Sequence, residues 1–441
     1  MRPVGVHVSS VRRLPPTSVP LYRLVLRVVV VAAGLVALKS FVIDPLTGHF
    51  TGSFEDFSAY LGAARSMAAG GSPYAQFDPG TVVMSGFVYP PFAAVLVRPL
   101  ALLSDQMALT VWLIGSVGCA VAGAIIVART ALPASWPRVE LGVLAALAFA
   151  PATYNYWHGQ INPLIFLLLA LAYRAYTQDR EILTGVVLGV AAGIKVAPVV
   201  LILLLLRRHW WRGTATMITT GAVTVTVGLV ALGAGTTQTF FKTVFPALNR
   251  GVGWIYDQSL GGAVSRLGAH SVLRVQPTST LFQAGSVVAG VAIVAAAVWA
   301  TRAGTRSPQE RGAEFGLGVT AMMLAGAVAW FPHFTHLLIP LFAAVGLAAS
   351  RGWRHERGLV LAAVSAVVVF GVIAPIVIAQ LTINGIAAIS ATPAWWPFLQ
   401  LCSLPCVAAV WLAVALMRSL RAEPQRVAAN AGSRRALALR T

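Results

Sequence analysis

The sequence predicts an all-α integral membrane protein that crosses a lipid bilayer about twelve times. Of its 441 residues, 58% are hydrophobic and only 10% are charged. Soluble domains carry about 25% charged residues, so this composition excludes a water-soluble or a disordered chain. The charged residues stand in short runs between long apolar stretches, which is typical of a multi-pass membrane protein.

Most of the predicted spans are single apolar stretches, and several of them are shorter than the length that a bilayer prefers. They cover residues 24–42, 107–128, 141–156, 164–176, 213–232, 284–300, 315–330, 337–349, 359–381 and 396–417. The stretch 183–206 is too long for one span and holds Lys195 and Pro198 near its middle. We interpret it as two short helices hinged there, because a broken helix at membrane depth is tolerated only where it lines protein or a water-filled cavity.

The basic residues predict the orientation, because Lys and Arg favour cytoplasmic loops. A hairpin at Lys195 and an even number of crossings place both chain ends and every large basic cluster on the cytoplasmic side. These clusters are Arg12, Arg13, Arg23 and Arg27; Arg129 and Arg138; Arg174 and Arg180; Arg207, Arg208 and Arg212; Arg302, Arg306 and Arg311; Arg351, Arg354 and Arg357; and the tail from Arg418 to Arg440.

This orientation divides the chain into three parts. We expect a cytoplasmic N-terminal segment (1–20), a transmembrane domain (21–418) and a basic cytoplasmic tail (419–441). The long loops 44–90 and 233–280 then lie on the extracytoplasmic side. The first 20 residues have no small-residue cleavage site after a short apolar core, so we do not expect a cleaved signal peptide.

The net charge bears on the kind of partner that the protein binds. The formal charge is +19, which by itself suggests nucleic acid. Because the basic residues lie in loops between spans, we expect the lipid bilayer as partner and no nucleic acid.

Cys119, Cys402 and Cys406 all lie in apolar stretches without metal-ligand spacing, and we expect them to be small core residues.

The first outward loop contains a predicted amphipathic helix near the membrane surface. Its apolar residues recur at helical spacing and are Phe57, Tyr60, Leu61, Ala64 and Met67. The Gly-Gly-Ser-Pro sequence at 70–73 ends it. Residues 89–103 begin with Tyr-Pro-Pro-Phe. Their sequence predicts an apolar helix that is too short for a full span and that we expect to be re-entrant.

The carboxylates of this loop are the first candidates for chemistry. Asp56 lies on a helix at the bilayer surface, where a carboxylate is costly unless it is used or paired. Partial burial would raise its pKa toward the range of a general base. A helix N-cap or a solvated loop charge is the alternative for Asp56 and for its neighbour Glu55.

Further polar groups lie at the ends or in the middle of apolar stretches. Gln160 and Asn162 join two predicted spans, and Lys195 must pair or line a cavity because it interrupts an apolar run. His333 and His336 lie within four residues of each other, just after a proline break at the outer end of a span pair. Two such histidines suggest a site, but no third ligand stands nearby in sequence, so we expect no metal.

Taken in order, several segments resemble glycosyltransferase family 87, integral membrane enzymes of the GT-C superfamily. The resemblance covers residues 24–349. The segments are Asp56 with Tyr60, residues 89–94 running into 99–103, Gly-Gln-Ile-Asn at 159–162, Ala-Gly-Ile-Lys-Val-Ala-Pro at 192–198 before the Arg207–Arg208 pair, and Asp-Gln-Ser-Leu-Gly-Gly at 257–262 with Arg266. Asp257 stands where the family usually has Asn, and residues 330–336 stand where it has a Pro-containing Trp/His segment.

The resemblance implies a GT-C fold and an inverting transfer of one mannose from polyprenyl-phosphate-mannose to a glycolipid or lipoglycan acceptor. Actinobacterial members act in this way on phosphatidylinositol mannosides of the cell envelope, on its outer face and with no cofactor. Asp56 would be the general base. The residues expected to bind the donor phosphate are Lys195, His336, His333 and Arg266. The residues expected to bind sugar are Glu55, Tyr60, Tyr89, Gln160, Asn162, Asp257 and Gln258.

Three alternatives stay open at this point. The Glu55-Asp56-Phe57 run is similar to the acidic pair of an arabinofuranosyltransferase in the same family, so polyprenyl-phosphate-arabinose is a second candidate donor. A lipid-linked sugar transporter or flippase would also have many spans, a broken helix and intramembrane charge. Against a transporter, the chain has no paired halves with matched interruptions. A membrane scaffold would place no acidic residue in a cavity.

Overall fold

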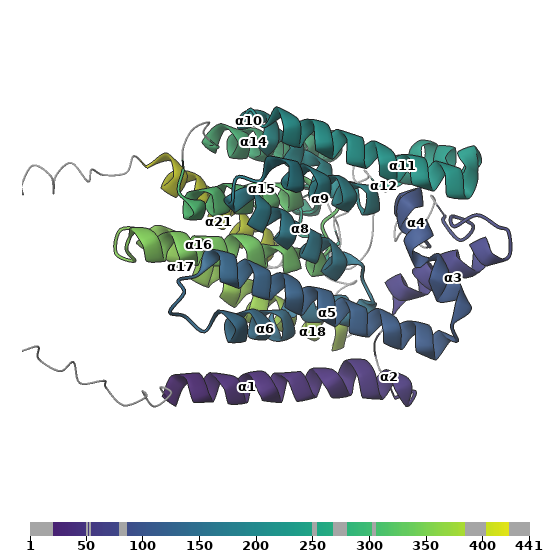
Figure 1. Cartoon of the computed structure of the whole chain (residues 1–441), viewed down its shortest axis with the longest axis horizontal. Helices are drawn as coiled ribbons and strands as arrows, with labels where there is room; N and C mark the ends of the chain where they lie inside the picture. Colours follow the sequence, from purple (N-terminus) through teal and green to yellow (C-terminus); the bar gives the residue numbers. More distant parts are fainter. Residues whose placement is uncertain are drawn as a thin grey trace, which may run out of the picture.

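A computed structural model describes residues 21–49, 52, 54–78, 86–248, 254–267, 280–301, 306–383 and 403–422. Their regular structure is helical, apart from one isolated antiparallel bridge between Asp257 and Trp330. The all-α prediction is therefore confirmed. Most of the long helices run along the long axis of the molecule (Figure 1). The predicted segment 1–20 lies outside the described residues, as does nearly all of the predicted tail.

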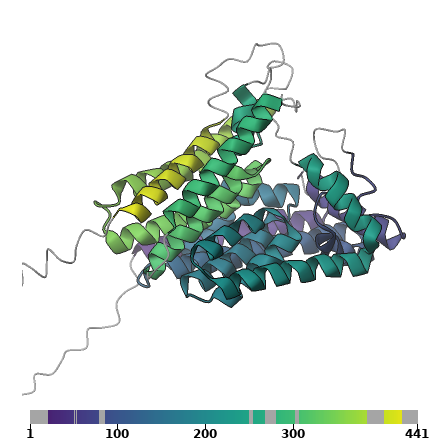
Figure 2. The ribbon, with the colours of Figure 1, turned by 90° about the horizontal axis from the view of Figure 1, so that it is seen from above.

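The helices follow one another closely. In the first half of the chain they are α1 (Leu21–Leu38), η1 (Lys39–Ile43), α2 (Asp44–Leu46), α3 (Glu55–Ala68), α4 (Pro91–Val97), η2 (Arg98–Leu102), α5 (Asp105–Ala131), α6 (Arg138–Ala148), α7 (Ala150–His158), α8 (Asn162–Thr177), α9 (Glu181–Ile194), η3 (Ala197–Leu201) and α10 (Ile202–Arg207). In the second half they are α11 (Trp211–Thr239), η4 (Phe240–Val244), α12 (Phe245–Leu248), α13 (Leu260–Leu267), α14 (Thr280–Ala300), α15 (Pro308–Ala325), η5 (Phe331–Leu337), α16 (Leu338–Arg351), α17 (Arg357–Val368), η6 (Val369–Ile373), α18 (Ala374–Ile383) and α21 (Leu404–Arg421). Seen from above, the later helices form a group inclined to the earlier ones (Figure 2).

The described residues contain 7 helical segments that are long and apolar enough to cross a membrane. They are Leu21–Leu46, Asp105–Ala131, Trp211–Leu248, Gln283–Ala300, Phe331–Arg351, Arg357–Ala379 and Leu404–Arg421. Shorter apolar helices cover Pro91–Leu102, Glu181–Ile194 and Ala197–Arg207. The chain is a multi-pass membrane protein.

The segment around Lys195 forms the expected hairpin. α9 ends at Ile194, and Lys195 is extended before the chain resumes as η3 and α10. Arg208 after α10 lies 3.6 Å from Asp179 before α9, so the two arms begin and end at the same end of the bundle. A helix of the length of α9 extends about 21 Å, less than the hydrocarbon thickness of about 30 Å, so Lys195 stays within the bundle.

Glycines bring α9 and α11 unusually close together. Gly185, Gly189 and Gly193 recur every fourth residue and form one face of α9. A Cβ on Gly189 would lie 2.7 Å from the carbonyl oxygen of Met217, closer than real Cβ atoms come. This contact of backbone against backbone fixes the end of α9 and therefore the position of Lys195.

Two predicted boundaries were wrong. The expected loop from residue 233 is still helical, since α11 continues through a kink at Gly233 (φ 81°) to Thr239 and on to Leu248. A glycine adopts this left-handed conformation at little cost, so the chain turns and resumes its helix instead of ending it. The last helix also runs beyond residue 418 to Arg421.

The amphipathic helix of the first loop is confirmed as α3. All five predicted apolar positions are buried, and Gly70, in the left-handed conformation, follows its end. α3 and α4 lie at the end of the bundle opposite the turn between α16 and α17 (Figure 1).

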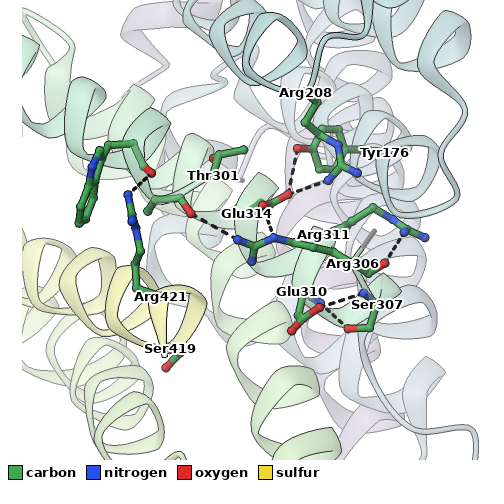
Figure 3. A network of polar contacts seen from close by, with 12 residues as sticks. Tyr176, Arg208, Thr301, Arg306, Ser307, Glu310, Arg311, Glu314, Ser419 and Arg421 are labelled. Carbon is green, nitrogen blue, oxygen red and sulfur yellow. Dashed lines mark hydrogen bonds and ion pairs between the residues drawn. The ribbon is translucent and has the colours of Figure 1, made fainter. Parts of the chain in front are cut away.

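Ion pairs join the helices at the end of the bundle where α16 turns into α17 (Figure 3). Glu314 on α15 is 0% exposed and pairs with Arg208 and with Arg306, each at 2.8 Å. Arg311, also on α15, donates to the carbonyl oxygen of Thr177 at 3.0 Å and pairs with Asp179 at 2.9 Å. The start of α15 is thereby tied to the ends of α8 and α10.

Candidate functional site

A chain of hydrogen bonds joins three segments that are far apart in the sequence. Gln160 Nε2 donates to Asp56 Oδ2 at 2.6 Å, and Asn162 Nδ2 donates to Gln160 Oε1 at 2.9 Å. Lys195 Nζ donates to Asn162 Oδ1 at 2.7 Å. Two amides therefore connect the Asp56 carboxylate to the Lys195 amine.

His333 from η5 adds a fourth segment to this site. Its Nε2 lies 3.0 Å from Lys195 Nζ. A protonated lysine only donates, so Nε2 accepts and the ring proton belongs on Nδ1. Tyr89 completes the surroundings, with its ring centroid 5.8 Å from Lys195 Nζ.

Local backbone features explain why these side chains meet. Asp56 lies in the first turn of α3, where the positive end of the helix dipole favours a carboxylate. Gly159 has a φ of 65°, and a Cβ there would lie 2.5 Å from Cβ of Phe57. Only glycine therefore allows the turn that carries Gln160 to pack directly against α3.

Buried side chains hold the site from behind. Tyr60 donates to the hydroxyl of Tyr89 at 3.1 Å, and its own hydroxyl accepts from the backbone N–H of Ile161 at 3.3 Å. Asn155 donates to the carbonyl oxygen of Pro332 at 2.9 Å and to the hydroxyl of Thr335 at 2.6 Å. The turn that bears His333 is thereby attached to α7.

The side chains of the candidate site differ in how exposed they are. Asp56, Lys195 and His333 are only half-buried. Gln160 is 4% exposed and Asn162 is 0% exposed. A substrate can therefore reach the carboxylate, the amine and the imidazole, while the amides fix their relative positions.

Burial raises the pKa of Asp56 from 3.8 to about 7. The hydrogen bond from Gln160 and the charge of Lys195 act in the opposite direction, and the charge of Glu55 adds to the increase. A carboxylate with a pKa near neutrality is well suited to accept a proton in catalysis.

Asp257 and Arg266 make structural contacts beside the site. Arg266 is buried, and its Nη1 donates to the carbonyl oxygens of Trp254 (3.0 Å) and Asp257 (2.6 Å). Asp257 Oδ1 accepts from the backbone N–H groups of Ser259 (3.0 Å) and Ala329 (2.9 Å). Burial raises the pKa of Asp257. Contacts of Arg266 with phosphate, or of Asp257 with sugar, stay predictions.

The other predicted residues lie at varying distance from this chain of contacts. Gln258 is buried and donates to the carbonyl oxygen of Ile255. His336 is buried and stacks on Phe166, with ring centroids 6.3 Å apart. Glu55 is exposed next to Asp56. Roles of these three residues in binding substrate stay predictions as well.

Sequence reasoning missed two polar residues that support the site. Asn155 lies behind the turn of His333, and Trp112 donates from Nε1 to the carbonyl oxygen of Gly159 at 2.7 Å. An asparagine within an apolar helix was the available signal for the first. Among the described residues, no three His, Cys, Asp or Glu side chains converge as metal ligands would.

The described fold is that of a multi-pass membrane protein, and its candidate site connects a carboxylate to a lysine. Residues 87–330 match glycosyltransferase family 87. This match covers more than half of the chain, and the chain belongs to that family. Gln160, Asn162 and Lys195 lie inside the matched segment, whereas Asp56 precedes it and His333 follows it.

The curated relatives are mycobacterial mannosyltransferases. The chain is 30% identical over 223 residues to the polyprenol-phosphate-mannose-dependent α-(1-2)-phosphatidylinositol pentamannoside mannosyltransferase of Mycolicibacterium smegmatis, covering 49% of this chain and 53% of that one. It is 27% identical over 286 residues to the polyprenol-phosphate-mannose-dependent α-(1-2)-phosphatidylinositol mannoside mannosyltransferase of Mycobacterium tuberculosis, covering 62% of this chain and 64% of that one. The chain thus matches between half and two thirds of these relatives. No solved structure matches it significantly.

Proposed function

We propose that this protein transfers one mannose from polyprenyl-phosphate-mannose to a phosphatidylinositol mannoside, with inversion at the anomeric carbon. The names of the relatives support the donor and the acceptor. The observation that carries the proposal is the connection of Asp56, with a pKa of about 7, to Lys195 through Gln160 and Asn162.

Asp56 acts as the general base of this reaction. The acceptor hydroxyl oxygen attacks the anomeric carbon, and the bond from that carbon to the phosphate oxygen breaks. The bonding electrons leave with the polyprenyl phosphate, and the hydroxyl proton passes to the Asp56 carboxylate. A base with a pKa near 7 accepts this proton at neutral pH and releases it afterwards.

Lys195 and His333 stabilise the leaving phosphate. Negative charge grows on the phosphate as the bond to the sugar breaks, and a preorganised ammonium nearby offsets it. His333 carries its ring proton on Nδ1 and donates a hydrogen bond from that atom to the same phosphate. His336 and Arg266 are further candidates for this anion, and Gln160, Asn162, Tyr60, Tyr89, Glu55, Asp257 and Gln258 for the sugar hydroxyls.

The reaction takes place on the extracytoplasmic face in this proposal. The positive-inside rule supports this orientation, because Arg174, Arg180 and Arg212 are exposed at the Glu314 end of the bundle, which is the cytoplasmic end in this proposal. The α3 end then faces outward. A lipid-phosphate sugar reaches it sideways, keeping its isoprenoid tail in hydrocarbon.

The test is sugar transfer by the purified protein in detergent. We expect mannose transfer from polyprenyl-phosphate-mannose to phosphatidylinositol mannoside and none from polyprenyl-phosphate-arabinose. Transfer from the arabinose donor alone would show that the donor is polyprenyl-phosphate-arabinose and not polyprenyl-phosphate-mannose. Movement of the lipid-linked sugar across vesicles without transfer would instead establish a flippase.

Sidedness is tested with single cysteines in a variant whose native cysteines are replaced by serine. An impermeant maleimide applied to intact cells should label Ser58→Cys at the α3 end and should not label Arg212→Cys. The reverse pattern would place the site in the cytoplasm.

A further inference from the structure

A group of half-exposed aromatic side chains lies next to the candidate site. Trp254 contacts Tyr256 and Trp330, with ring centroids 4.7 Å and 5.4 Å apart. Tyr154 contacts His158, with centroids 6.1 Å apart. All five side chains are partly exposed. We call these five residues the aromatic strip.

The strip extends from the candidate base to the turn that bears His333. Its first end meets α3, because the N–H of Phe54 donates to the carbonyl oxygen of Trp157 at 3.4 Å and the His158 ring interacts electrostatically with Glu55. At the other end, the carbonyl oxygen of Trp330 accepts from the N–H of His333 at 2.8 Å.

The two parts of the strip also meet each other. The ring of Tyr154 packs edge-on against Phe331 at 5.1 Å, and the N–H of Phe331 donates to the carbonyl oxygen of Tyr256 at 2.8 Å. The strip is therefore continuous across α7, the turn at 254–256 and the start of η5.

Buried charged residues fix the backbone beneath the strip. Arg266 binds the carbonyl oxygen of Trp254, and Asp257 binds the N–H of Ala329 at 2.9 Å. The backbone that carries the rings is thus fixed by contacts within the protein. Preorganised aromatic side chains lose little conformational entropy on binding.

The strip is neither a core cluster nor a simple membrane belt. Phe331 behind it is completely buried, whereas the five members of the strip keep an exposed face. Residues of an aromatic belt stand around the circumference of a protein at the headgroup level. Here the rings gather at one place, next to the carboxylates of α3 and to His333.

We propose that the aromatic strip binds the carbohydrate headgroup of the acceptor. Sugar rings present apolar C–H faces that stack on aromatic rings, and the hydroxyls of Tyr154 and Tyr256 add hydrogen bonds to sugar hydroxyls. The strip begins at α3 near Glu55, the neighbour of Asp56 in the sequence, so a headgroup lying along it presents its terminal hydroxyl to the base. This inference rests on the proposed function.

The experiment compares Trp254→Ala, Tyr256→Ala and Trp254→Phe with the wild-type protein, with Trp353→Ala as control. Trp353 stacks on Trp136 and is likewise an exposed tryptophan, but it lies at the Glu314 end of the molecule. Mannose transfer gives KM for the acceptor and KM for the donor. Binding to the Asp56→Asn protein is measured with phosphatidylinositol mannoside and with phosphatidylinositol lacking mannose.

Each alanine substitution should raise the acceptor KM roughly two- to tenfold and leave the donor KM unchanged. Trp254→Phe should restore most of the affinity, and Trp353→Ala should change neither constant. In the binding experiment, the alanine substitutions should lower the affinity of the Asp56→Asn protein for the mannosylated lipid only. An unchanged acceptor KM, or an equal loss for both lipids as for a membrane belt, would overturn the inference while leaving the proposed function intact. Absence of transfer by the wild-type protein would instead reject the proposed function.

Discussion

The two ends of α8 contain two polar clusters with opposite properties. At its N-terminus, Asn162 belongs to the site of Asp56 and Lys195. At its C-terminus, Tyr176 donates to Glu314 at 3.3 Å in the cluster of Glu314, Arg208 and Arg306. Both clusters contain a carboxylate in an apolar protein, yet their surroundings differ.

The difference lies in how fully each carboxylate is neutralised. Glu314 is completely buried and has two arginines at 2.8 Å, so its charge is paired on both oxygens. Asp56 is half-buried, accepts its hydrogen bond from a neutral amide and has a raised pKa. A carboxylate with both oxygens in ion pairs holds helices together, whereas a carboxylate without a full ion pair remains available for proton transfer.

The largest effect on activity is expected from Asp56→Asn. An amide cannot accept the proton of the acceptor hydroxyl, so kcat should fall about 10²- to 10⁴-fold. Thermal unfolding should change little, because the side chain is half-buried and keeps its shape. Full activity of Asp56→Asn would exclude Asp56 as the base.

Glu314→Gln should have the opposite profile. Removing the anion takes the paired carboxylate from Arg306 and leaves Arg208 with only its longer contact to Asp179 at 3.6 Å among the described residues, which should lower the free energy of unfolding by about 3 kcal/mol. Transfer by the protein that remains folded should be close to normal. The control Glu140→Gln removes an exposed pair with Arg27 and should cost less than about 1 kcal/mol. Equal stability of the two variants would show that the Glu314 cluster is not a structural one.

Lys195→Met tests the cationic half of the site. Loss of the ammonium should weaken donor binding roughly 10- to 100-fold and leave acceptor binding largely unchanged. Lys39→Met is the matched control, since Lys39 is exposed and pairs only with nearby Asp44 at 2.8 Å among the described residues. Unaltered donor affinity in Lys195→Met would remove Lys195 from the phosphate site.

The pH profile should show the smallest but most specific effect. Since Asp56 works only when deprotonated, kcat/KM should rise with pH, and the midpoint of the rising limb should lie near pH 7. Glu55→Gln removes a like charge, so the pKa of Asp56 falls and the rising limb moves to lower pH. Gln160→Leu removes a stabilising hydrogen bond, so the limb moves to higher pH. Shifts in the same direction would contradict this arrangement.

The sequence alone predicted the features that depend on local patterns. Apolar stretches and basic clusters indicated an all-α membrane protein, and the spacing of Phe57, Tyr60 and Leu61 indicated α3 with its buried face. Lys195 beside Pro198 indicated the hairpin. These predictions succeeded because burial in lipid and helical periodicity act on neighbouring residues.

Only the tertiary structure decided which polar groups meet. Nothing in the pattern indicated that Gln160 binds Asp56, 104 positions away, or that Lys195 binds His333, 138 positions away. Nor did the basic cluster pattern reveal that Arg208 and Arg306 share the buried Glu314. Such contacts depend on how whole helices pack, including the close approach of α9 to α11, and local sequence carries little information about that geometry.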